Sequence, residues 1–73
     1  MHQILTIIEK DTFGYYAHCP ALEGYQTQGD SLEEVEQNIK EAISLYLSTL
    51  TEEEKKQLFE KELTAMITEV QVA

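Results

Sequence analysis

Arginine is absent from this 73-residue chain, and its five lysines are set against 14 aspartates and glutamates, giving a formal net charge of −9 at pH 7. Nucleic-acid binding requires cations that neutralise phosphates, and arginine is the commonest reader of guanine. The composition therefore predicts no direct contact with DNA or RNA. A basic protein, or a partner whose binding does not depend on charge, suits this composition better than a nucleic acid does.

Cysteine is nearly absent as well, since Cys19 stands alone and cannot close an internal disulfide. Dense disulfides are typical of small secreted domains, so their lack favours a reducing compartment and a cytoplasmic location. The N-terminal apolar stretch ends at Ile8, and no lysine precedes it. Such a stretch is too short for a membrane span and lacks the basic start of a signal peptide. We therefore expect no membrane association.

The chain is also short, and its length predicts one domain over residues 1–73. A domain of this size buries only about 60% of the surface that its unfolded chain exposes. Chains below roughly 70–80 residues usually gain stability from disulfides, a metal or a second chain. Because a disulfide is excluded, we expect a homodimer or a higher homo-oligomer.

Hydrophobic patterning predicts an α+β domain of two layers, with an antiparallel sheet and the order β-β-β-α-α-β. The segment Gln3–Glu9 is rich in β-branched residues and apolar on both faces, which predicts a central strand covered on each side. Tyr15–Cys19 and Tyr25–Gln28 are predicted as the second and third strands. The last strand is predicted at Ala65–Val72 and should return to the sheet beside the first, so that the helices cover one face.

Two capping boxes mark the helices, because each pairs a hydroxyl residue with a glutamate three positions later. The box Ser31–Glu34 opens a helix predicted to end near Leu47 or Thr49. The box Thr51–Glu54 opens a shorter helix predicted to end near Glu62. Apolar residues recur at helical spacing on one face of the first helix, namely Leu32, Val35, Ile39, Ala42, Ile43, Tyr46 and Leu50.

Residues with catalytic or metal-binding chemistry are few. His2 and His18 are far apart in the sequence, and neither stands in a metal-ligand spacing. His18 and Cys19 are adjacent in a predicted strand, so they point to opposite faces and cannot bind one ion together. Cys19 is expected to fill the core under the first helix. The sequence thus predicts a non-enzymatic protein without metal or cofactor.

Two groups of residues are candidate interaction surfaces, for a partner or for self-association. Tyr16 and His18 share one face of the second predicted strand. Glu33, Glu36 and Glu41 lie on the outer face of the first helix, in the region that carries most of the negative charge. Either surface could bind another protein, and one of them could be the homomeric interface.

The residues from Gly14 to Ala42 read GYYAHCPALEGYQTQGDSLEEVEQNIKEA. In this stretch an aromatic–x–Ala strand ends in proline, a connector with leucine and glycine follows, and T-Q-G-D-S opens a helix that carries N-x-x-E-A. These ordered features resemble the HicB family of type II toxin–antitoxin antitoxins. The chain departs from that family's usual Pro, Cys and Ala at Glu23, Tyr25 and Val35. The matching residues are Tyr15, Ala17, Pro20, Leu22, Gly24, Thr27, Gln28, Gly29, Asp30, Ser31, Glu34, Asn38, Glu41 and Ala42.

This resemblance implies a partial ribonuclease-H-like fold that lacks nuclease activity and that assembles into dimers or larger oligomers. It implies an antitoxin that binds a small basic HicA-like toxin, which cleaves mRNA. Many members carry a C-terminal DNA-binding segment, and the chain resembles the N-terminal domain without that tail.

Two alternative functions remain open from the residues alone. The first is a homo-oligomeric structural or small-ligand-binding domain without a toxin partner. The second is a residual nuclease, which would need acids clustered on strands to hold Mg²⁺. The predicted strands offer only Glu9 and Glu69, with Asp11 just beyond, so the nuclease is the least favoured of the three functions.

Overall fold

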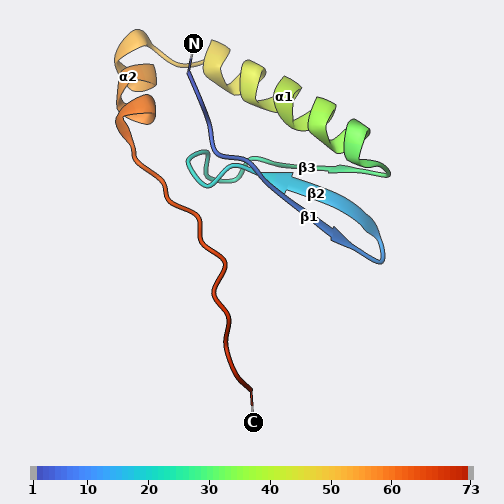
Figure 1. The fold of residues 1–73 in the computed structure, drawn as a ribbon. Helices are drawn as coiled ribbons and strands as arrows, with labels where there is room; N and C mark the ends of the chain where they lie inside the picture. The colour runs from blue at the N-terminus through green and yellow to red at the C-terminus, as the bar shows by residue number, and fades with distance from the viewer. Residues whose placement is uncertain (1, 73) are drawn as a thin grey trace.

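A three-stranded antiparallel sheet followed by two helices forms the fold (Figure 1). The structure is a computed structural model and describes residues 2–72. Its sheet and helices confirm the predicted α+β class. In chain order the elements are β1 (Ile7–Asp11), β2 (Gly14–His18), β3 (Gln26–Gly29), α1 (Leu32–Ser48) and α2 (Glu52–Glu60).

A tight hairpin joins β1 to β2 and fixes which side chains share a face. The Asp11 carboxylate accepts a hydrogen bond from the backbone N–H of Phe13 at 2.7 Å, and Gly14 takes a φ of 139°, which L side chains rarely adopt. Strand register then pairs Ile8 with Ala17. Because side chains alternate along a strand, Ala17 faces the helices, whereas its neighbour Tyr16 faces the other side of the sheet.

The connector from β2 to β3 contributes to the core as well as turning the chain. The backbone N–H of Leu22 donates to the Cys19 carbonyl at 2.9 Å, and that of Tyr25 donates to the Leu22 carbonyl at 3.1 Å. Gly24 takes the positive φ that the sequence suggested for it. These turns bury Leu22 completely against the helix-facing side of the sheet.

Helix α1 packs on β2 and β3. Ser31 caps it by accepting from the Glu34 backbone N–H at 3.1 Å, so this half of the predicted capping box is present. Val35 and Ile39 bury their side chains, and the Asn38 amide donates to the Gln28 carbonyl at 2.9 Å, which ties the helix to β3. The core of buried residues comprises Ala17, Cys19, Leu22, Val35 and Ile39.

The first strand differs from its prediction. It begins at Ile7 rather than Gln3 and lies at one edge of the sheet, where it pairs with β2 alone. Since α1 covers β2 and β3, Ile8 remains 37% exposed although it points to the helix side. The prediction of a central strand was therefore wrong, because one helix over three strands does not reach β1.

The predicted last strand is not formed in the described part of the chain. Residues 61–72, which we call the C-terminal arm, are extended without secondary structure and project from the body (Figure 1). Lys61 has the extended backbone angles φ −72° and ψ 125°, so the chain leaves α2 without turning back. The radius of gyration is 14.4 Å, whereas a compact chain of this length would have one of about 11 Å.

Gly29 allows the close approach of α1 to β3. A Cβ at this position would lie 2.7 Å from the backbone nitrogen of Val35, closer than real contacts allow. We predict that Gly29→Ala lowers the free energy of unfolding by about 1–3 kcal/mol, because neither backbone can yield without moving the helix. Urea denaturation at one fixed protein concentration measures this. Gln28→Ala, at an exposed neighbour, serves as the control and should change stability by less than about 0.5 kcal/mol.

Candidate functional site

The outer face of the sheet carries Tyr16 and His18, both half-buried. In the strand register Tyr16 stands between Glu9 of β1 and Gln28 of β3. His18 stands between Ile7 and Gln26 in the same way. The helices lie on the opposite face, so this surface combines two aromatic rings with three polar neighbours and the apolar Ile7.

The outer face of α1 is acidic and exposed. Glu33, Glu36 and Glu41 all lie on the solvent side of the helix, as predicted. The expected outward arrangement is thus present, and Gln37 donates to the Glu41 carboxylate at 3.1 Å. The sole ion pair within residues 2–72 joins Lys55 to Glu52 at 3.4 Å. The three carboxylates of α1 therefore carry their charge without a lysine partner.

These two groups of residues do not form one site. Val35 and Ile39 of α1 pack on the sheet face that contains Ala17, while Tyr16 points from the other face. The helix acids therefore lie on one side of the molecule and the Tyr16–His18 pair on the other. A single small partner domain could cover either group, and the sheet and helix separate the two.

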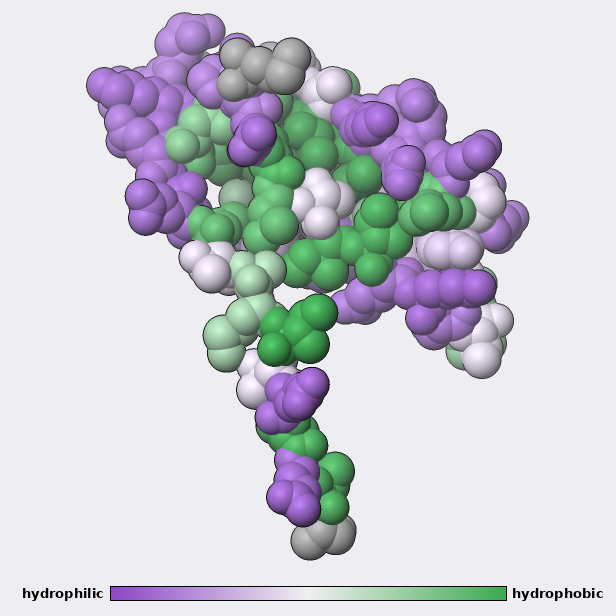
Figure 2. All heavy atoms as spheres, in the orientation of Figure 1, coloured by the Kyte–Doolittle hydropathy of each residue, from purple (hydrophilic) through white to green (hydrophobic). Residues whose placement is uncertain are grey.

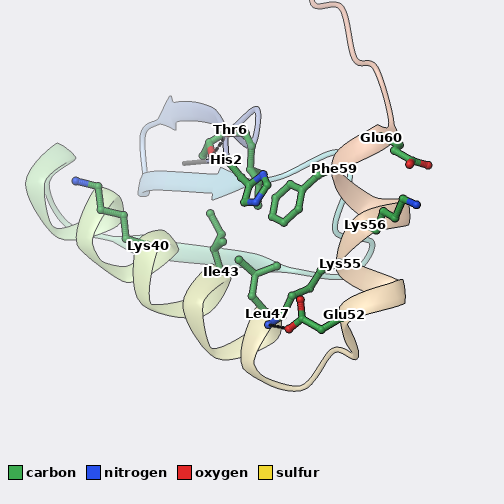
Figure 3. Close-up of a pocket in the computed structure, with 11 residues that line it drawn as sticks. His2, Thr6, Lys40, Ile43, Leu47, Glu52, Lys55, Lys56, Phe59 and Glu60 are labelled. Carbon is green, nitrogen blue, oxygen red and sulfur yellow. Dashed lines mark hydrogen bonds and ion pairs between the residues drawn. The ribbon is translucent and has the colours of Figure 1, made fainter.

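A cleft of about 1030 Å³ lies between the N-terminal segment, α1 and α2. Ile43 and Leu47 of α1 form part of its apolar wall, and the His2 and Phe59 rings stack across it with centroids 4.0 Å apart (Figure 3). Sequence reasoning missed this cleft because its walls come from three distant segments. The lining also includes Lys40 of α1 and Lys55 and Lys56 of α2, and the Lys40 ammonium group lies apart from the other two (Figure 3).

Contacts with the N-terminal segment and the core hold α2 in place. Phe59 stacks on His2, and Leu58 packs against the core cluster. No residue of α2 is fully buried, so its capping box matters for its stability. That box is complete: the Thr51 backbone N–H donates to the Glu54 carboxylate at 2.9 Å, and the Glu54 N–H donates to the Thr51 hydroxyl at 3.1 Å.

Cys19 and the acids that the sequence offered for a nuclease site lie outside the cleft. Cys19 is only 2% exposed, with the Thr6 hydroxyl 3.5 Å from its sulfur, so it is the core residue that the sequence predicted. Glu9 and Asp11 lie on β1, whereas Glu69 lies in the C-terminal arm. Between His2 and Val72 no group of three or more His, Cys, Asp or Glu side chains is placed to hold a metal ion.

The capping box predicts a measurable titration. Hydrogen bonds from the Thr51 backbone, and then from its side chain, hold the pKa of Glu54 below its ordinary value. A depressed pKa stabilises the fold above the ordinary pKa of glutamate, and that contribution is lost as the pH falls through the lowered pKa. We therefore expect NMR titration to give Glu54 a pKa below the ordinary value of glutamate in the wild-type chain, and a higher pKa in Thr51→Ala, which lacks the hydroxyl group. Equal pKa values for Glu54 in the two chains would contradict the capping geometry.

The fold defines a small acidic α+β domain with its core on one side of the sheet, the exposed glutamates of α1 on one side of the molecule and the Tyr16–His18 pair on the other. Within residues 2–72, neither helix has the length and apolarity that crossing a membrane would require. A family model described as "HicB_like antitoxin of bacterial toxin-antitoxin system" matches residues 4–72. The chain therefore belongs to the family of HicB-like antitoxins, as its sequence motifs indicated.

Curated relatives support this assignment. A UPF0150 protein of Synechocystis is 39% identical over 72 residues, which cover 92% of this chain and 91% of that protein. A UPF0150 protein of Helicobacter pylori is 53% identical over 51 residues, covering 70% and 71% of the two chains. A third, from Thermoplasma acidophilum, is 47% identical over 51 residues, covering 68% of this chain and 74% of the relative. No solved structure gives a significant match.

Proposed function

We propose that this protein is an antitoxin that neutralises a small basic HicA-like toxin by direct binding, without catalysis of its own. Membership of the HicB-like antitoxin family supports a toxin–antitoxin role. The observation that carries the finer proposal is the outer face of α1, where Glu33, Glu36 and Glu41 are exposed and without lysine partners. A toxin that cleaves mRNA must attract phosphates, so its active surface should be basic and complementary to this face.

The position of α1 suits such a role. Its inner face is anchored by Val35 and Ile39 in the core and by the bond from Asn38 to β3. The acidic outer face is therefore presented on a rigid element, and little conformational entropy is lost when a partner binds there. Carboxylates spaced along one helix face would occupy the positions that RNA phosphates take on the toxin.

Tyr16 and His18 are a second surface that a toxin could contact, and the two surfaces predict different salt responses. Binding through the α1 carboxylates should weaken steeply as salt rises, because exposed charges are screened. Binding through the two half-buried rings should depend little on salt. We place the toxin on α1 because four glutamates and one lysine give this helix a net charge of −3, with Glu33, Glu36 and Glu41 exposed on its outer face.

A charge-neutralising variant tests this placement. We expect Glu33→Gln/Glu36→Gln/Glu41→Gln to weaken binding of a purified HicA-like toxin by about 10-fold, since each exposed pair is worth a few tenths to one kcal/mol. Isothermal calorimetry at low salt measures the affinity. Glu23→Gln/Glu53→Gln/Glu62→Gln is the matched control, because it changes the net charge equally at exposed positions elsewhere.

The control separates a local contact from a general effect of charge. Equal weakening by both triple variants would contradict the placement of the toxin on the outer face of α1. It would not contradict the formation of the complex. Absence of any complex at low salt would contradict the antitoxin proposal. Rescue of cells from growth arrest on co-expression with the toxin provides the corresponding functional measurement, and the α1 variant should rescue less well than the control.

A further inference from the structure

The outer edge of β1 lacks a strand partner. In the described sheet the order is β1-β2-β3, so one side of β1 pairs with β2 and the other pairs with nothing. Its helix-facing side is open too, since Ile8 is 37% exposed. Figure 2 shows apolar surface over this part of the molecule, between the polar surfaces of α1 and α2. An open strand edge with apolar side chains beside it is a template for another strand.

The C-terminal arm has the sequence and conformation of a strand without a sheet. It is extended, and its large apolar side chains are in solvent: Ile67 is 99% exposed and Val70 is 78% exposed. Met66 and Val72 are exposed as well. Isolated apolar residues on a surface are ordinary, but four large exposed ones within residues 66–72 of a chain this small indicate an association site.

We propose that the C-terminal arm of one copy pairs along the β1 edge of a second copy, and that the second copy returns the same contact, giving a strand-exchanged homodimer. The two parts match in length. The arm offers eight residues from Ala65 to Val72, and the first strand with the extended residues before it runs from Ile4 to Asp11. Each copy thus supplies the strand that the other copy's sheet lacks, which is the arrangement of a domain swap.

The direction of the arm favours a second copy over the arm's own sheet. Lys61, at the end of α2, is extended, and residues 61–72 include neither glycine nor proline to reverse the chain. The arm leaves the body beside the start of the first strand, where Leu63 lines a hollow with Gln3 and Leu5. Beyond that point it runs outward (Figure 1), so an exchanged strand needs no new turn.

The distribution of acidic residues also favours self-association through the arm rather than through α1. In a two-fold dimer a surface meets its own copy, so contact through α1 would bring Glu33, Glu36 and Glu41 against like charges. From Thr64 onward the arm carries a single acidic residue, Glu69. The exchanged strand therefore buries apolar side chains with little repulsion and leaves the acidic face of α1 available. This inference does not depend on the toxin proposal.

A single substitution in the arm tests the proposal on the full chain. Val70→Asp should raise the dissociation constant of the dimer by about 100-fold or more, because it places a charge twice per dimer on the side of the exchanged strand that faces Ile8. Leu45→Asp is the matched control at another exposed apolar residue, 67% exposed on α1, and should leave the dimer unchanged. Sedimentation equilibrium measures both, with circular dichroism confirming that each variant retains its helices.

A monomeric wild-type chain, or equal effects of Val70→Asp and Leu45→Asp, would overturn the proposal. A mixed-label NMR experiment tests where the arm lies. Copies carrying ¹³C methyl groups are mixed with unlabelled copies, and isotope-filtered spectra select contacts between chains. Contacts between Val70 and Ile8 of different copies would support the exchanged strand. Contacts within one copy only, or an arm without such contacts, would contradict it.

Discussion

The position of α1 over β2 and β3, but not over β1, is the constraint on which the rest of this structure depends. Two features of the sequence set that position: Gly29 lets the helix backbone approach the sheet, and Asn38 bonds to the carbonyl of Gln28. The helix then covers Ala17 fully and leaves Ile8 partly exposed. The result is a core on one side of the sheet, an open strand edge and a cleft beside α2.

The surfaces that result differ in chemistry, and that difference separates two kinds of association. The outer face of α1 is charged and exposed, so it suits a partner of opposite charge that salt can displace. The C-terminal arm is apolar, so it suits a contact that salt does not weaken. A chain of charge −9 repels its own copies at every acidic face, which leaves the arm and β1 as the natural place for self-association. In the proposed dimer, the α1 face that we propose as the toxin-binding surface stays exposed.

The helix caps and the buried face of α1 could be predicted from the sequence, whereas the packing of distant segments against one another could not. Thr51 and Glu54 form the predicted capping box, and Val35 and Ile39 are buried as the helical spacing indicated. The edge position of β1 was not predicted. Apolar residues on both faces of a strand indicate that both faces should be buried, but they do not show which elements bury them. The stacking of His2 on Phe59 joins the N-terminal segment to α2, and no pattern in the sequence around either residue indicates this contact. Of the candidate site, the outward direction of Glu33 and its neighbours followed from helical periodicity, but their separation from Tyr16 required the packed structure.

If the arm is exchanged as we propose, one chain alone does not complete this fold. Equilibrium urea unfolding at two protein concentrations tests this, because a fold completed by a second chain gains stability by mass action. We predict that a hundredfold increase in concentration raises the apparent free energy of unfolding by about 2.7 kcal/mol per dimer. An unfolding midpoint that does not change with concentration would show that a single copy is complete and would contradict the account.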